Sequence, residues 1–325
     1  AGCRSAGRAE EAAEGAAPGA EGAGGEEGAE GAEAHDASEP TSFAVSPQNG
    51  NPHRCTLIYL HGWTGTAEDY LCRDSHTADM SLPWRLGDTY APGLRVLLPA
   101  APTIPQPWGE ATASWYGYAC QESNRVGDLS TLQAARESLG QCVRSELELL
   151  GGDSRRLFLG GMSQGCTAAL DVYLREAVPL QLGGFVGSVG FVPSDAMGFT
   201  GADEALERLV ADVEQARRPL WLNCALEDDH EVPWSLVHSS LGPLRGRLPG
   251  LMVQKLRGVG HEIGDWEAFI LNNFLENHAF DAYGDDMDEV VAEDFEEEES
   301  YWEWALDDEI EIQLDVGPDI PGMYG

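Results

Sequence analysis

One serine of this chain lies between two glycines, where a predicted strand meets a predicted helix. Residues 161–165 read Gly-Met-Ser-Gln-Gly, after the apolar run 157–159 and before the helix-like run 166–170. A serine hydroxyl becomes an effective nucleophile only when the fold exposes it and a neighbouring base takes its proton. A sharp turn from strand to helix exposes the hydroxyl, and its glycines let the backbone pass close to itself. We therefore predict that Ser163 is a catalytic nucleophile; the alternative is an N-cap at an ordinary helix start.

An acid and a histidine follow two later apolar runs. The predicted strand 219–224 leads into a run of acidic residues, and the predicted strand 251–256 leads to His261. Hydrolases with a Gly-x-Ser-x-Gly turn have serine, acid and histidine in this chain order. We predict that His261 is the general base and that Asp229 orients it, with Asp228 as the second choice for the acid.

Apolar runs alternate with helix-like segments from residue 55 to residue 278. The runs are continuously apolar, which indicates strands that are buried on both faces of a sheet. The alternation predicts a mostly parallel sheet with helices on both faces, in which ligands bind at the carboxyl ends of the strands. The predicted strands are 55–60, 94–98, 157–159, 184–189, 219–224 and 251–256, and the predicted helices are 128–150, 164–177, 202–216, 234–241 and 266–278.

Acyl transfer also requires hydrogen-bond donors for the oxyanion of the tetrahedral intermediate. The backbone N–H of Gln164 is one candidate, because this residue opens the helix after the serine. The loop 61–65 reads His-Gly-Trp-Thr-Gly and follows the first predicted strand. Its glycines allow backbone amides to turn inward. We predict that the backbone N–H of Trp63 is the second donor.

Two other histidines are weaker candidates for a chemical role. His230 directly follows Asp229 and would have to fold back on its own loop to act as the base. His61 has no second ligand beside it, so we expect it to order its loop rather than to bind a metal. The cysteines lack any CxxC or CxH spacing, and we expect no metal site.

Together these motifs resemble one known family. The matching pieces are Leu-His-Gly at 60–62, Leu-Pro-Ala-Ala-Pro at 98–102, Ser-Trp-Tyr at 114–116, Gly-Gly-Met-Ser-Gln-Gly at 160–165, Ser-Val-Gly-Phe-Val-Pro at 188–193, Asp-x-x-Val-Pro at 229–233 and Gly-His at 260–261. The chain is similar, over roughly residues 54–278, to the phospholipase/carboxylesterase (acyl-protein thioesterase-like) family of α/β-hydrolases. The resemblance implies an α/β-hydrolase fold and a monomeric or dimeric serine hydrolase of acyl esters or thioesters, with no cofactor.

The resemblance leaves the substrate pocket open. The family loop usually reads His-Gly-x-Gly-Asp, whereas Trp63 and Thr64 follow the first glycine here. Three downstream aromatic residues, Trp108, Trp115 and Tyr116, are expected either to line an acyl pocket or to pack in the core and at its rim. The acyl chain length, the leaving group and the oligomeric state are not defined by any of these motifs.

Acidic residues are concentrated at the two ends of the chain. The net charge is −37; residues 1–40 hold ten acidic and two basic residues, and residues 281–325 hold 18 acidic residues and no Lys or Arg. This balance argues against nucleic-acid binding, which requires clustered Lys and Arg. We expect a disordered Gly/Ala/Glu-rich segment at 1–50, an α/β-hydrolase domain at 51–280, and an acidic, disordered tail at 281–325.

The remaining composition bears on location. No apolar stretch reaches about 18 residues, so we expect no transmembrane helix. The first forty residues lack the apolar region of a secretory signal. Seven scattered cysteines, an odd number, favour a reducing compartment, and we expect a cytoplasmic location.

A second hypothesis is a non-catalytic scaffold on the same fold, because a fold does not determine a function. Aromatic and aliphatic residues set among the acids of the tail are typical of docking segments, so the tail could bind a protein partner. The other interpretation of the tail is a solvated extension. A scaffold has no need of a serine, an acid and a histidine in hydrolase order, which favours the enzyme.

Overall fold

The computed structural model of the 325-residue chain describes most of residues 42–279 and one short segment of the tail. The described residues are 42–47, 50–72, 82, 92–121, 123–193, 202–225, 229–257, 260–261, 265–279 and 310–313. Contacts divide the chain into two units, Ala1–Ser38 and Glu39–Gly325, and all described residues belong to the second unit. Most of the N-terminal segment for which we expect disorder therefore lies outside the described residues.

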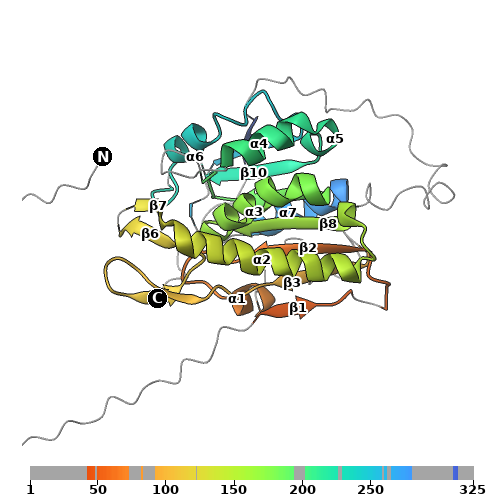
Figure 1. The fold of residues 1–325 in the computed structure, drawn as a ribbon, viewed down its shortest axis with the longest axis horizontal. Helices are drawn as coiled ribbons and strands as arrows, with labels where there is room; N and C mark the ends of the chain where they lie inside the picture. The colour runs from red at the N-terminus through yellow and green to blue at the C-terminus, as the bar shows by residue number, and fades with distance from the viewer. Residues whose placement is uncertain are drawn as a thin grey trace, which may run out of the picture. The chain divides into compact units, whose positions relative to one another are not determined.

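The described strands form one eight-stranded sheet and two small hairpins. The order in the sheet is β1-β3-β2-β8-β9-β10-β11-β12 (Figure 1). Strand β1 runs antiparallel to β3, and every other neighbouring pair is parallel. The predicted mostly parallel sheet is thus confirmed, and its six inner strands are the six predicted ones. The bounds are β1 (Phe43–Val45), β2 (Cys55–Leu60), β3 (Leu94–Leu98), β8 (Leu157–Met162), β9 (Gly184–Ser188), β10 (Leu220–Ala225), β11 (Leu251–Arg257) and β12 (Ile310–Gln313).

The five predicted helical segments are helical in the structure, one of them divided in two, and a short helix at 67–72 was not predicted. The bounds are α1 (Ala67–Cys72), α2 (Leu129–Leu149), α3 (Gln164–Leu180), α4 (Ala202–Ala211), α5 (Val213–Ala216), α6 (Trp234–Ser240) and α7 (Asp265–His278), with a 3₁₀ turn at Ser154–Arg156. We expected one helix over 202–216, but Asp212 interrupts it. Its backbone is extended, and its side chain accepts a hydrogen bond from the Gln215 N–H. Aspartate at an N-cap satisfies a free donor of the next helix, so it begins a new helix here.

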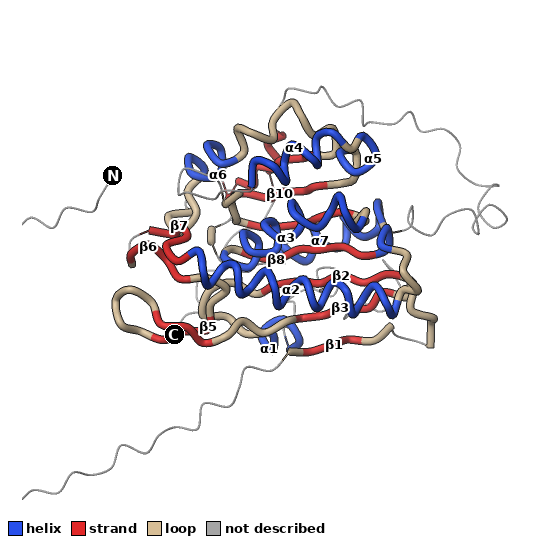
Figure 2. Tube along the Cα trace, viewed as in Figure 1, coloured by secondary structure: helices blue, strands red, loops and turns tan. Residues whose placement is uncertain are grey.

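Helices cover the sheet on both faces, as Figures 1 and 2 show for α2 and α3 in front and α7 behind. Successive residues of β2 point into opposite layers. Ile58 and Leu60 pack in a core with residues of α2 and α3, whereas Leu57 and Tyr59 pack in a second core with α1 and α7. Burial on both faces explains why the inner strands are continuously apolar.

The elements that the sequence did not predict are short. Two hairpins lie between β3 and α2, formed by β4 (Thr103–Pro105) with β5 (Ala111–Ala113), and by β6 (Gly117–Cys120) with β7 (Ser123–Asp128). Strand β1 also lies within the segment 1–50, for which we expected disorder. Strands of three to six residues are too short to show a clear period in the sequence.

Four residues of the acidic tail form β12 at the edge of the sheet. They lie parallel to β11, with Glu311 opposite Lys255. Ile310 and Ile312 alternate with polar residues, which is the two-residue period of a strand. At these four positions the structure differs from the expected disorder, and the rest of 281–325 lies outside the described residues.

Candidate active site

Ser163 occupies a strained turn between β8 and α3. Its backbone has φ 54° and ψ −121°, a conformation that side-chain-bearing residues rarely adopt. A Cβ on Gly161 would lie 2.7 Å from the carbonyl carbon of Gly165, and one on Gly165 would lie 2.3 Å from the His61 oxygen. The turn therefore requires glycine at both positions, and a hydrogen bond from the Ser163 N–H to the Ser188 carbonyl (2.8 Å) holds it.

The hydroxyl of Ser163 contacts a histidine rather than its own helix. Its Oγ lies 2.7 Å from Nε2 of His261, and its side chain makes no capping hydrogen bond to α3. The alternative of an ordinary N-cap therefore does not describe the contacts of this serine. The two residues are 98 positions apart in the sequence and meet because β8 and β11 both end at this edge.

Asp229 binds the other nitrogen of that imidazole. Its Oδ2 lies 2.9 Å from His261 Nδ1, while its Oδ1 accepts hydrogen bonds from the N–H groups of Glu231 (2.9 Å) and Val232 (2.7 Å). An ionised carboxylate only accepts, so Nδ1 carries the proton and Nε2 presents its lone pair to Ser163. The Asp229 side chain is 1% exposed and that of His261 is 20% exposed. Asp228, the second choice for the acid, lies outside the described residues.

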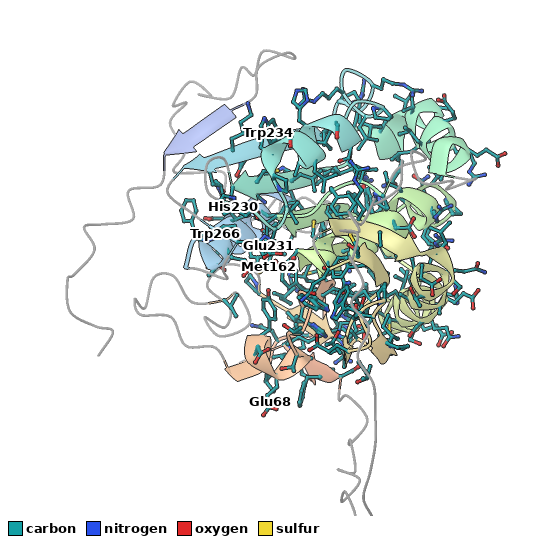
Figure 3. All side chains as sticks on the ribbon, turned by 90° about the vertical axis from the view of Figure 1, so that its left-hand side faces the viewer. Glu68, Met162, His230, Glu231, Trp234 and Trp266 are labelled. Atoms are coloured by element: carbon teal, nitrogen blue, oxygen red, sulfur yellow. The ribbon has the colours of Figure 1, made fainter. Side chains whose placement is uncertain are left out.

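The three residues follow the carboxyl ends of β8, β10 and β11, on the edge that faces the viewer in Figure 3. Met162 and Glu231, which adjoin Ser163 and the Asp229 turn, are labelled near the centre of that view. His230 is exposed on this edge, and the hydrogen bond to Asp229 comes from His261.

His61 orders the loop between β2 and α1. Its Nδ1 lies 2.8 Å from the Gly62 carbonyl, and its Nε2 accepts from the Ala101 N–H at 3.1 Å. These partners fit a neutral ring protonated on Nδ1. Burial lowers the pKa of His61 below 6.5, in agreement with that state. The indole N–H of Trp115 also donates to the His61 carbonyl (2.8 Å), so both ends of this residue are held.

The loop lies directly against the serine. A Cβ on Gly62 would lie 3.4 Å from the Ser163 Cβ. Thr64 has φ 58° and donates its N–H to the Ala113 carbonyl (3.1 Å). The backbone of Trp63 lies between these two anchored residues. On the other side of Ser163, Gln164 is the first residue of α3, so its N–H has no acceptor within the helix.

The Gln164 side chain has a role that the sequence reasoning missed. It is buried, and its Oε1 accepts from the Trp115 N–H at 2.8 Å. Its Nε2 donates to the Tyr116 carbonyl (2.9 Å) and to the Ser114 hydroxyl (2.8 Å). This amide therefore ties residues 114–116 to the serine turn. In the sequence, the one sign that residues 114–116 and the serine turn belong together was that both match motifs of the same family.

Three aromatic residues were expected either to line a pocket or to pack in the core and at its rim. Two of them, Trp115 and Tyr116, pack in the core. Trp115 is 2% exposed and Tyr116 is 1% exposed. The Trp115 ring packs on His61 (centroids 5.2 Å apart), and Tyr116 packs edge-on against Tyr118. The structure thus places Trp115 and Tyr116 in the core, and a pocket-lining role for them stays a prediction.

Trp108 is half-buried and belongs to a different group. Its ring contacts Trp63 edge-on (6.0 Å) and stacks on Tyr118 (6.5 Å). The Trp63 indole N–H donates to the Thr112 hydroxyl (3.0 Å). Of these three rings, those of Trp63 and Trp108 are partly exposed and that of Tyr118 is buried, and Trp63 belongs to the loop that lies against Ser163.

Within the described part of the chain, no group of three or more His, Cys, Asp or Glu residues is arranged to hold a metal ion. Among the described helices, none has the length and apolar character needed to cross a membrane.

The sheet is mostly parallel and helices cover both of its faces, and a strained serine turn lies at its carboxyl edge. These features define the α/β-hydrolase class. Within this class, the chain belongs to the phospholipase/carboxylesterase family, whose sequence profile matches residues 42–210. That range includes Ser163 and ends before Asp229 and His261.

Named relatives agree with this family. The chain is 29% identical over 144 residues to acyl-protein thioesterase 1 of Schizosaccharomyces pombe, covering 43% of this chain and 58% of that protein. It is 28% identical over 148 residues to acyl-protein thioesterase 1 of Yarrowia lipolytica, covering 43% and 59%. The chain thus spans less than two thirds of the length of these curated relatives.

A solved structure supports the fold. The crystal structure of Zea mays acyl-protein thioesterase 2 matches with a TM-score of 0.55 at 20% identity, covering 74% of this chain and 99% of that one.

Proposed function

We propose that this chain is a serine hydrolase that cleaves acyl esters or thioesters. The observation that carries the proposal is the continuous hydrogen-bonded series from Ser163 Oγ to His261 Nε2 (2.7 Å) and from His261 Nδ1 to Asp229 Oδ2 (2.9 Å). This is the arrangement in which a base activates a serine and an acid holds the base in the required tautomer.

In the first half of the proposed reaction, Ser163 Oγ attacks the acyl carbonyl while its proton moves to His261 Nε2. Asp229 keeps the other nitrogen protonated and stabilises the imidazolium that forms. The backbone N–H groups of Gln164 and Trp63 donate to the oxyanion of the tetrahedral intermediate. The intermediate collapses as His261 returns the proton to the leaving alcohol or thiol, which leaves an acyl group on Ser163.

Water completes the cycle by the same route. His261 takes a proton from the water as it attacks the acyl-enzyme, and a second tetrahedral intermediate forms. The imidazolium then gives that proton to Ser163 Oγ, and the carboxylic acid leaves. All proton transfers use residues of this chain, so no cofactor is proposed.

The substrate class follows from the family and from the surface beside the serine. Both curated relatives are named acyl-protein thioesterases, which supports a thioester or ester carbonyl as the reacting group. The partly exposed rings of Trp63 and Trp108, which contact each other edge-on, offer an apolar surface suited to the acyl portion.

The alternative of a scaffold with a partner-binding tail gains no support from the described part of the tail. Strand β12 pairs with β11 of the same chain, so its backbone donors and acceptors are engaged internally on that side.

The test combines a fluorophosphonate probe with turnover of p-nitrophenyl acyl esters. We expect wild type and the exposed-serine control Ser235→Ala to label and turn over alike, and Ser163→Ala to do neither. Equal labelling of wild type and Ser163→Ala would overturn the proposed function. A chain-length series of acyl esters and thioesters, compared by kcat/KM, then defines the substrate.

A further inference from the structure

One carboxyl side chain outside the candidate triad is fully buried. Glu267 is the third residue of α7 and is 0% exposed. It stands six positions after His261 in the sequence, at the start of the helix into which the His261 loop leads. Acidic residues are almost never fully buried unless specific partners satisfy them, so the contacts of this side chain indicate what it does.

Two tyrosine hydroxyls donate to the same oxygen of Glu267. Tyr59 forms a short hydrogen bond to Oε1, and the Tyr70 hydroxyl lies 3.1 Å from it. The two tyrosine rings pack edge-on with centroids 5.4 Å apart, and both side chains are buried. A buried polar group that loses its hydrogen-bond partner costs free energy, so these contacts hold three side chains in one arrangement.

Each tyrosine belongs to an element that borders the site. Tyr59 lies in β2 two residues before His61, and it pairs with Gly160 of β8. A Cβ on Gly160 would lie 2.9 Å from the Tyr59 ring, so the ring fits closely against the strand that ends at the serine turn. Tyr70 lies in α1, the helix that follows the loop 61–65.

The cluster also reaches the residue before the serine. The Tyr70 hydroxyl lies 3.4 Å from Met162 Sδ, and Met162 is the last residue of β8. The Glu267 carboxylate therefore connects the start of α7 to β2 and α1, and through Tyr70 it adjoins the end of β8. The oxyanion loop of the proposed reaction lies between β2 and α1, the nucleophile follows β8, and the general base His261 lies four residues before α7.

We infer that Glu267 is a positioning residue for the proposed active site, because its bonds to Tyr59 and Tyr70 fix the start of α7, and with it the His261 loop, against the strands that hold Ser163. The inference rests on the proposed function. Glu267 touches neither the substrate nor Ser163, and it acts through the distance between Ser163 Oγ and His261 Nε2.

The Tyr59 hydroxyl keeps its proton in these buried surroundings. Burial, followed by the charge of Glu267, raises the pKa of Tyr59 well above its usual value. Tyr59 thus stays protonated and remains a donor. Burial chiefly, with Glu267 as a minor contributor, also raises the pKa of the Cys166 thiol, which lies three residues after Ser163.

The experiment compares Glu267→Gln and Tyr70→Phe with Glu276→Gln, an exposed control for the same change on the same helix. For each variant the sites are titrated with fluorophosphonate, and kcat, KM and the probe inactivation rate are expressed per titrated site. A displacement of about 1 Å in a catalytic group costs about 10²-fold. We expect Glu267→Gln to lower kcat and the inactivation rate about 10- to 100-fold with KM nearly unchanged, Tyr70→Phe to lower them less, and Glu276→Gln to match wild type.

A residue that only stabilises the fold would change the number of titrated sites and leave the rate per site unchanged. Wild-type rates per site in both Glu267→Gln and Tyr70→Phe would overturn the inference. If Glu267→Gln does not fold, Tyr70→Phe decides: a three-fold or larger loss per site supports the inference, and no loss overturns it.

A second readout does not depend on activity. The hydrogen bond from His261 Nδ1 to Asp229 should give a far-downfield proton NMR signal that is absent in His261→Gln. We expect this signal to shift or disappear in Glu267→Gln and to persist in Glu276→Gln. If wild type and Ser163→Ala label alike, the proposed function fails, and an unshifted signal in Glu267→Gln would then overturn the positioning role as well.

Discussion

Replacing Asp229 with asparagine changes one atom of the side chain, and the structure determines where that change falls. The Oδ1 atom accepts two backbone N–H groups, from Glu231 and Val232, and Oδ2 faces the imidazole of His261. An asparagine must keep its oxygen toward the two donors, because turning it would leave both backbone N–H groups, one of them buried, facing an NH₂ group. Its NH₂ group therefore points at His261 Nδ1 and donates to it.

That donor reverses the tautomer of the base. With Nδ1 accepting, the ring proton moves to Nε2, which then has no lone pair for the Ser163 proton. A change of this kind lowers kcat about 10⁴-fold in a serine–histidine–aspartate site, or about 5 kcal/mol of transition-state stabilisation. We expect a loss of this size in Asp229→Asn, with the fold and KM close to those of wild type.

The assay is steady-state hydrolysis of a p-nitrophenyl acyl ester near neutral pH, normalised to folded protein. Asp228→Asn is the matched control, since this neighbouring acid is the other candidate from the sequence, and we expect it to lose less than ten-fold. The reasoning is refuted if Asp229→Asn keeps more than a tenth of the activity, or if the large loss falls on Asp228→Asn instead.

Two further predictions concern the residues that support the site. Gln164→Leu removes the acceptor of the Trp115 N–H, whereas the Tyr116 carbonyl still accepts from the Ser114 hydroxyl at 2.7 Å. One unsatisfied buried group costs about 1–3 kcal/mol, so we expect the free energy of unfolding to fall by about 2 kcal/mol; urea unfolding checks this, and an unchanged free energy of unfolding would contradict it. Burial lowers the pKa of His61 below 6.5 in the folded chain. At acidic pH the unfolded chain therefore binds more protons at this residue than the folded chain does. The contribution of His61 to the free energy of unfolding is fully present above about pH 6.5 and is lost as the pH falls below that value. Urea midpoints between pH 5 and pH 8 should fall less steeply on acidification in His61→Gln than in wild type, and equal slopes would count against this role.

The inner part of the fold was predictable because the six inner strands of the large sheet are packed between helices on both faces. Continuous apolar runs separated by long amphipathic helices leave few alternatives to a covered parallel sheet. The edge strands β1 and β12 have one exposed side and only three or four residues, so their patterns are weak. The break at Asp212 was not predicted because a single capping residue hardly alters the apolar period of the surrounding helix.

The candidate site was predictable where the strand order carries the information. The structure brings Ser163, Asp229 and His261 together, as the positions after three strand ends suggested, and their catalytic roles stay predictions. The sequence could not separate inward-facing from outward-facing aromatic residues, and so it left Trp115 and Tyr116 undecided. It also could not reveal Glu267, because a glutamate in a sequence gives no sign of burial. Its role is recognised only from its contacts in the folded chain.

The pairing of the sheet also determines when the site comes into existence during folding. Strand β8, which carries Ser163, reaches β11, which leads to His261, only through β9 and β10. All four strands are parallel, so each alignment closes a long loop of chain before it gains any contact, which makes such pairings slow. No local fragment holds the serine and the histidine together, and the first detectable turnover in a refolding experiment should coincide with completion of the sheet.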